Sequence, residues 1–227
     1  MSTRSPGGAR HSREGHPQES AADRVYAYVK DRIVTGSYAG GTMVSEGEVS
    51  AAVEISRTPV REAFLRLAIE GLLRLYPKRG ALVVPVSAQE IHDVLDARLL
   101  IERHAAETVI HTGAHHEVAA ALRVILGQQH PGDEEPDAHR FSELDRQFHS
   151  TLVEAAHNRL LADFYATLRD RQLRMGTAAL RRNPARYVAI LAEHSTLADL
   201  IDAGDLEGVR ATLFDHLAAT RAAATTG

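Results

Sequence analysis

The sequence predicts a mainly α-helical protein, in which a small unit of helices and a β-hairpin precedes an all-α helical bundle. Apolar residues recur at helical spacing in successive segments between Ala21 and Gly71. Two short apolar runs then flank residues 77–80, and helical spacing resumes at Ser87 and continues almost to the end of the chain. With 227 residues, the chain is long enough for two small domains.

The N-terminal unit is predicted to begin after a polar tail. Residues 1–20 are rich in Ser, Gly, Pro, His and charged residues, a composition typical of disorder. A helix follows and ends at Gly36. Ser45 and Glu48 have the spacing of a capping box, which predicts a second, short helix through about Val53.

A third helix is predicted to start at Ser56 or Thr58, either of which can cap it, and to end at Gly71. Its predicted inward-facing residues are Val60, Phe64, Leu65 and Leu67.

A β-hairpin is predicted next, because apolar runs at residues 72–76 and 81–86 flank a four-residue tip, PKRG, at 77–80. The basic side chains of this tip suit a sugar-phosphate backbone, and Gly80 would allow a close approach. Three helices followed by a hairpin are the element order of a winged helix-turn-helix, which we expect over residues 21–86.

Charge is distributed unevenly along the chain. Residues 21–86 hold nine Lys or Arg and seven Asp or Glu, whereas residues 87–227 hold 14 Arg and 21 Asp or Glu. The stretch 56–82 holds six basic and two acidic residues. This basic patch on an acidic chain indicates either a local anionic partner or a chance cluster on a solvated surface.

The first turn of the third helix, residues 56–61 (SRTPVR), has side chains suited to DNA. Arg57 and Arg61 are four residues apart and project from one helix face. One guanidinium can bind guanine O6 and N7 while the other binds phosphate. The hydroxyls of Ser56 and Thr58 can bind phosphate as well. By spacing alone, an exposed charged helix without a DNA partner fits equally well.

The run SRTPVREAFLRLAIEGLL, residues 56–73, resembles the recognition helix of the GntR family of bacterial repressors and activators. The resemblance implies DNA-contacting roles for Ser56, Arg57, Thr58, Arg61, Arg79 and Gly80. Two positions depart from the family pattern. Gly47 stands where relatives often carry a basic residue, and Glu54 replaces a glycine in the turn before the recognition helix.

The second part of the chain, residues 87–227, is predicted to be helical throughout. Asn183 followed by Pro184 is expected to begin one of the helices, as cap and first residue. About six helices are expected, over residues 88–111, 115–127, 137–156, 158–179, 184–203 and 206–222.

Three histidines and one aspartate are predicted to face the core of this bundle. Asp145 and His149 share the apolar stripe of one predicted helix, and His194 and His216 lie among apolar residues of two later helices. A single inward histidine is more often a hydrogen-bonded core residue. Four such groups on neighbouring helices favour a divalent metal instead, with Zn²⁺ first and Ni²⁺, Mn²⁺ or Fe²⁺ as alternatives. Tetrahedral and six-coordinate geometries both remain open.

The stretches 144–161 (LDRQFHSTLVEAAHNRLL) and 205–217 (DLEGVRATLFDHL), with Glu193-His194 between them, resemble the FCD ligand-binding domain of the FadR subfamily of GntR regulators. The helix count is similar to its six-helix, VanR-like version. The resemblance implies a divalent metal on the four residues named above, beside a small carboxylate effector. It also implies that Arg98 binds the effector; a surface salt bridge of Arg98 with Glu102 is the alternative.

Together these features predict a homodimeric, cytoplasmic repressor that binds a pseudo-palindromic double-stranded operator and releases it on binding the effector. No apolar run approaches the ~20 residues that cross a bilayer, so no membrane partner is expected. The chain has no cysteine. A metal-dependent hydrolase or lyase is the less favoured alternative, because no general base is evident and the recognition helix would be unexplained. In a third interpretation the N-terminal unit still binds DNA, but the metal has a purely structural role.

Overall fold

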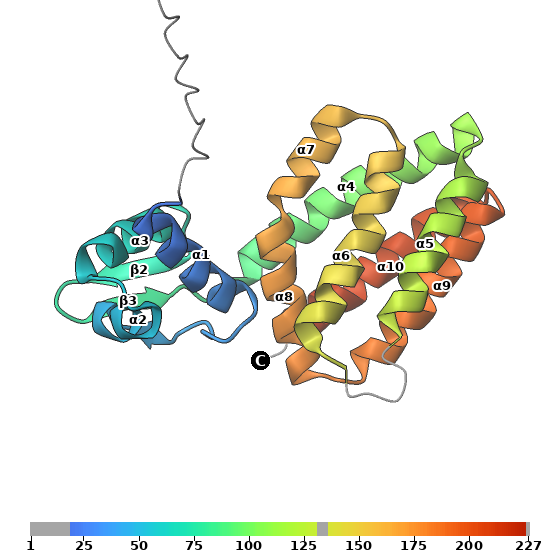
Figure 1. Ribbon diagram of the computed structural model, residues 1–227. Helices are drawn as coiled ribbons and strands as arrows, with labels where there is room; N and C mark the ends of the chain where they lie inside the picture. The colour runs from blue at the N-terminus through green and yellow to red at the C-terminus, as the bar shows by residue number, and fades with distance from the viewer. Residues whose placement is uncertain (1–18, 131–135, 226–227) are drawn as a thin grey trace, which may run out of the picture.

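The computed structural model describes residues 19–130 and 136–225, which form ten helices and three strands in two side-by-side units (Figure 1). The first unit, here called the head, consists of α1 (Ala21–Val34), β1 (Met43–Val44), α2 (Glu46–Val53), α3 (Arg57–Ile69), β2 (Leu73–Tyr76) and β3 (Gly80–Val83). The second, the bundle, consists of α4 (Ala88–Thr112), α5 (His115–Gln129), α6 (Ala138–Ala155), α7 (Arg159–Thr167), α8 (Arg169–Arg182), α9 (Arg186–Asp202) and α10 (Leu206–Thr225).

The mainly α fold with an N-terminal winged helix-turn-helix is confirmed. Ser20 begins α1 through a capping box with Asp23, and Val25, Val29 and Ile33 form the buried stripe that faces α3. Ser20 is part of the predicted tail and is ordered as a cap, while residues 1–18 of that tail lie outside the described residues.

The packing of α3 corrects one predicted core position. Val60, Phe64 and Leu67 are buried as expected, but the Leu65 side chain is 54% exposed and points away from the head core. The three buried positions follow the three- and four-residue period of one helix face, and Leu65 lies beside that face. Ser56 precedes the first residue of α3, although its side chain makes no capping hydrogen bond.

The sheet of the head has the strand order β1-β3-β2, all antiparallel. Strand β1 was not predicted, because two residues are too few to show an alternation. The hairpin tip is shorter than the predicted four residues, since Gly80 already pairs with Tyr76 across the turn. Gly80 has φ +101°, and a Cβ there would lie 2.4 Å from the Val44 carbonyl oxygen, so the fold itself requires this glycine.

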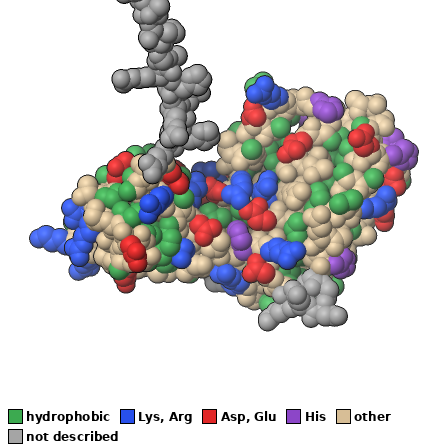
Figure 2. All heavy atoms as spheres, viewed as in Figure 1, with side chains coloured by type: hydrophobic (Ala, Val, Ile, Leu, Met, Phe, Trp, Pro, Cys, Tyr) green, Lys and Arg blue, Asp and Glu red, His purple; other side chains and the backbone are tan. Residues whose placement is uncertain are grey.

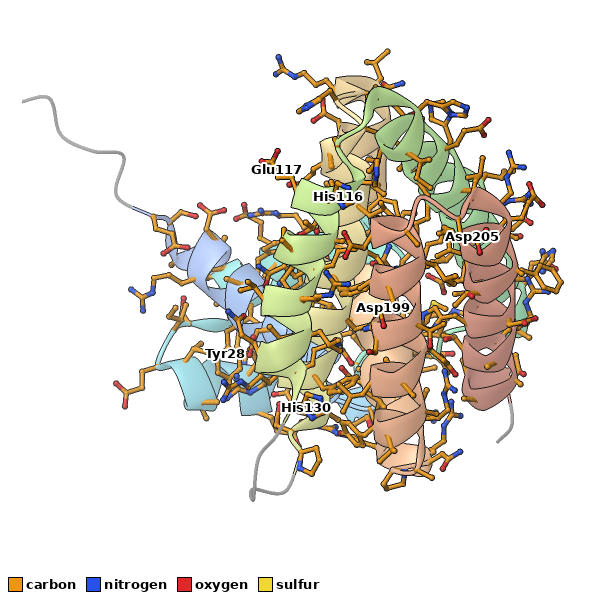
Figure 3. All side chains as sticks on the ribbon, turned by 90° about the vertical axis from the view of Figure 1, so that its right-hand side faces the viewer. Tyr28, His116, Glu117, His130, Asp199 and Asp205 are labelled. Carbon is orange, nitrogen blue, oxygen red and sulfur yellow. The ribbon has the colours of Figure 1, made fainter. Side chains whose placement is uncertain are left out.

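The bundle packs around a core centred on Phe148, Leu152 and Leu197. Helices α5 and α9 run side by side, and Figure 3 shows the labelled His116 of α5 and Asp199 of α9 on this outer face. Arg123 joins these helices through hydrogen bonds to Asp199 and Asp202. None of the helices in the described part of the chain is long and apolar enough to span a membrane.

The prediction of one helix over 158–179 is wrong. The structure has two helices, α7 and α8, that meet at Leu168, so the described part of the bundle has seven helices where about six were expected. The Thr167 hydroxyl donates to the Phe164 carbonyl at 2.6 Å, next to the break. Such side-chain bonds compete with the helix ladder and bend helices.

The predicted start of the next helix is also shifted. Asn183 ends α8 and lies in a turn with Pro184, and α9 begins only at Arg186. The backbone N–H of Arg186 donates to the Asn183 carbonyl at 3.1 Å, so a hydrogen-bonded turn joins the two helices.

Glu54 has φ 55° at the C-terminus of α2, in the left-handed region that favours glycine. We expect Glu54→Gly to raise the free energy of unfolding by about 0.5–1 kcal/mol, because the Cβ clash is removed. Glu54→Ala keeps the Cβ, so its free energy of unfolding should not rise in this way. Urea denaturation of both variants measures the difference, and equal midpoints for the two would contradict the assignment.

Candidate functional site

The first turn of α3 forms an exposed basic surface on the head. Arg57, Thr58 and Arg61 are exposed, as is Ser56 immediately before them. Figure 2 shows Lys and Arg side chains projecting from the end of the head farthest from the bundle. The predicted DNA-binding side chains of this turn therefore lie outside the head core and are available to a partner.

The two arginines of this turn have different surroundings. Arg61 Nε donates to Glu46 Oε2 at 2.7 Å, and its side chain is still 67% exposed. Arg57 extends over α2, where a Cβ at Gly47 would lie 3.6 Å from Arg57 Nη2. A Cβ at position 47 would therefore be in ordinary van der Waals contact with the Arg57 guanidinium.

The hairpin completes a concave surface with α2 and α3. The hollow is lined by apolar residues and by four basic side chains, Arg57, Arg61, Lys78 and Arg79. Lys78 has φ 64°, a left-handed turn conformation that directs the chain back into β3. A groove with basic side chains on two sides fits an anionic rod-like partner.

The predicted metal group comes together in the bundle. Asp145 and His149 of α6, His194 of α9 and His216 of α10 each offer a ligand atom, and these atoms all lie within 4.8 Å of one another. The three histidines are buried and Asp145 is half-buried. His194 Nε2 lies 3.2 Å from His149 Nε2 and 3.4 Å from Asp145 Oδ1.

Each of these imidazoles has an acceptor on its other nitrogen. His194 Nδ1 lies 2.8 Å from Gln129 Oε1, and His216 Nδ1 lies 2.6 Å from Glu193 Oε2. His149 Nδ1 lies 2.8 Å from Glu102 Oε2. Such partners fix ring orientation and place the proton on Nδ1, leaving Nε2 with its lone pair directed to the centre of the group.

The sequence did not reveal these acceptors as parts of the site: Glu102, Gln129 and Glu193. Glu193 adjoins His194 in the sequence, and Glu102 lies one turn after Arg98. These two sequence positions are the only clues to the acceptors that the sequence contains. Nothing in the sequence points to Gln129, because its contact with His194 joins residues 65 positions apart.

Electrostatics keep two of the imidazoles neutral. Burial lowers the pKa of His194 well below its usual value, and the nearby rings of His149 and His216 lower it further. Burial also lowers the pKa of His149, although the Glu102 carboxylate opposes this effect. Neutral imidazoles are the form that binds metal ions.

Glu193 and Glu102 remain ionised despite burial. Burial alone would raise the pKa of Glu193, but hydrogen bonds from His216 and Arg186 hold it at about 2. Burial alone would also raise the pKa of Glu102, but the charge of the adjacent Arg98 guanidinium outweighs burial, so this pKa is lowered.

The Arg98–Glu102 salt bridge exists, but it is not at the surface. Arg98 Nε donates to Glu102 Oε1 at 2.8 Å, and the two side chains are 5% and 0% exposed. The Tyr165 hydroxyl donates to the same oxygen at 2.7 Å. Arg98 Nη2 is buried and has no hydrogen-bond partner among the described residues.

A small cavity of about 30 Å³ lies beside the group and is lined by Asp145, Gly176, Arg186 and neighbouring apolar residues. A Cβ at Gly176 would lie 2.9 Å from the Ser142 hydroxyl, so α8 packs closely on α6 here. The space is about that of a single water molecule.

A winged helix-turn-helix with exposed arginines, joined to a helical bundle with a polar centre, defines a class of DNA-binding regulators. The model of the bacterial regulatory proteins of the gntR family matches residues 21–83, and the FCD domain model matches residues 93–219. The chain therefore belongs to the GntR family of DNA-binding transcriptional regulators and carries an FCD domain.

Relatives agree with this assignment. An uncharacterized HTH-type transcriptional regulator of Streptomyces ambofaciens is 30% identical over 86% of this chain and 81% of its own length. The HTH-type transcriptional repressor RspR of Escherichia coli K12 is 32% identical over 68% of this chain and 67% of its own. The solved structure of E. coli McbR/YncC is 22% identical, covers 89% of this chain and 96% of its own, and has the same fold with a TM-score of 0.66.

Glu102→Ala is expected to lower the free energy of unfolding by about 3–5 kcal/mol, because it leaves the Arg98 guanidinium buried without its carboxylate. Urea denaturation measures the loss. Glu107→Ala on the same helix is the matched control. It removes a half-exposed pair with Arg210 at 3.2 Å, for which less than about 1 kcal/mol is expected. An equal loss of unfolding free energy in the two variants would contradict the conclusion that the fold needs the buried Arg98–Glu102 pair.

Proposed function

We propose that this regulator is a repressor whose operator affinity is set by a small carboxylate, bound near a divalent metal in the bundle. In this proposal residues 21–86 bind DNA and residues 87–227 bind the metal and the effector. One observation carries it: three imidazoles and a carboxylate converge in a buried centre of a chain whose other end has the exposed arginines of a recognition helix.

The arrangement of lone pairs supports a cation at this centre. Glu102 and the Gln129 oxygen can only accept hydrogen bonds, so they favour protonated Nδ1 atoms on His149 and His194. Two neutral rings of this kind direct unprotonated Nε2 atoms at each other across 3.2 Å. That contact is repulsive without a cation between them, and the nearby Asp145 carboxylate adds a negative ligand.

Asp145, His149, His194 and His216 would hold the ion. The mixed nitrogen and oxygen donors suit Zn²⁺ first, and also Ni²⁺, Mn²⁺ or Fe²⁺. When bound, such an ion supplies a positive charge that attracts a ligand carboxylate. The rings are held for this role by their Nδ1 partners, and Phe148 stacks on His194 with centroids 4.1 Å apart.

Arg98 supports the effector assignment, because its Nη2 is a buried donor without a partner in the described residues. A carboxylate entering beside Asp145 could satisfy it. The adjoining cavity of about 30 Å³ is too small for such a ligand, so binding requires α8 to move away from α6. An effector that favours the moved arrangement by about 1–3 kcal/mol would change operator affinity roughly 5- to 150-fold.

In the head, we assign operator contacts to Ser56, Arg57, Thr58, Arg61, Arg79 and Gly80. The first turn of α3 would enter the major groove while the wing tip approaches the sugar-phosphate backbone. A homodimer would place one such helix in each half of a pseudo-palindromic operator.

Arg57→Ala and Arg61→Ala should each weaken operator binding about 5- to 150-fold, the effect of losing one bidentate base contact. Fluorescence anisotropy with a duplex selected from random DNA measures the affinity, and circular dichroism checks the helical content. Arg159→Ala, at a 92% exposed side chain on α7, is the control. Wild-type affinity in both head variants would refute the recognition-helix assignment.

His194→Ala should lower the metal content per chain to less than about half of wild type, because Nε2 of His194 is central to the group. Elemental analysis of protein purified without chelator measures it. His116→Ala, at a surface histidine on α5, should leave the content unchanged. Full occupancy in His194→Ala would remove this residue from the ligand set. Unfolding of the bundle on metal removal, without any thermal shift by small acids, would make the metal purely structural.

A further inference from the structure

A second cavity lies between the head and the bundle, away from the metal group. Its head side is formed by the segment from Ile33 to Gly40 and by the end of β3, and its bundle side by α8 with the start of α4. The cavity is partly open to solvent and has a volume of about 400 Å³, within the range of sites that bind small molecules.

The bundle side of this interdomain cavity is strongly basic. Arg174, Arg181 and Arg182 all line it from one face of α8. Among the described residues none of the three has a carboxylate within salt-bridge distance; they donate instead to the backbone carbonyls of Val84, Gly36 and Ala224. Their positive charge is therefore left without a counter-charge at the cavity wall.

A buried donor also lacks a partner here. The Thr177 side chain is 1% exposed and lines the cavity, and its hydroxyl makes no hydrogen bond within the described part of the chain. The hydroxyl oxygen is fully buried, and the methyl group of Thr177 lies toward Gly36 at the cavity wall, so Thr177 contributes to the apolar part of the lining.

The rest of the wall is mainly apolar. The head contributes Ile33, Val83 and Pro85, and the bundle contributes Met175 and Ala178. A ligand that fits both kinds of wall has an apolar body and an anionic group.

We propose that the interdomain cavity binds a small amphipathic organic anion, with its acidic group on the α8 arginines and its apolar body against the head. This site is separate from the metal centre, because Gly176, Ala179 and Leu180 of α8 face the small cavity beside Asp145 instead. A ligand here touches the head and the bundle at once, so its binding depends directly on the position of the head relative to the bundle.

The test uses the full chain and 1-anilinonaphthalene-8-sulfonate, an amphipathic anion whose fluorescence rises in an apolar site. We expect saturable binding at one site per chain. Arg181→Gln should weaken it roughly tenfold through loss of one charge-assisted hydrogen bond. Ala178→Phe should abolish it by filling the cavity while all the charges remain.

Two controls locate the probe. Arg171→Gln, on the same helix but paired with Glu90 at 3.3 Å, should bind the probe as wild type does. His194→Ala should do so as well. Thermal melting confirms that each variant is folded. The absence of saturable binding, or equal affinity in wild type and Arg181→Gln, would overturn the proposal. Binding lost in His194→Ala but kept in Arg181→Gln would assign the probe to the metal centre and overturn it equally.

Discussion

The Glu102 carboxylate is buried with no exposure and is contacted by polar or charged groups from three helices. Arg98 reaches it from the preceding turn of α4, Tyr165 from α7 and His149 from α6. An unpaired carboxylate in this position would cost several kcal/mol, so the three helices are held in the arrangement that pairs it. The same contact favours the proton on Nδ1 of His149. One buried charge therefore orients one of the three imidazoles of the polar centre.

Helix α8 lies between that centre and the DNA-binding head. One of its faces packs against α6 at Gly176, and another carries the ion pair of Asp170 with Lys30 of α1, at 2.8 Å. Because interiors are close-packed, a ligand that displaces α8 on one side must disturb its contacts on the other. Helix α8 alone could therefore couple the small cavity beside Asp145 to the interdomain cavity. This coupling needs only that the head contacts of α8 differ between two positions of the helix.

Much of this architecture could be predicted from periodicity, and the failures have physical causes. The inward positions of His149, His194 and His216 follow from the apolar residues around them, because helix faces are set locally. Strand β1 and the break at Leu168 escaped prediction, since two residues carry no period and a hydroxyl–carbonyl bond has no distinctive signature. The acceptors of the three imidazoles escaped because they are long-range contacts, fixed by how helices pack rather than by spacing.

The departures in the head bear on how the two arginines of α3 would meet DNA in the proposed operator complex. Arg57 has no carboxylate within ion-pair distance in the described residues, and a Cβ at Gly47 would be in van der Waals contact with its guanidinium. Arg61 is held by Glu46, but this pair is largely exposed, and such pairs contribute less than about 1 kcal/mol. A bidentate contact to guanine is worth about 1–3 kcal/mol. In the proposed operator complex DNA would therefore displace Glu46. Arg57 would bind without losing a partner, whereas Arg61 would have to exchange its partner first.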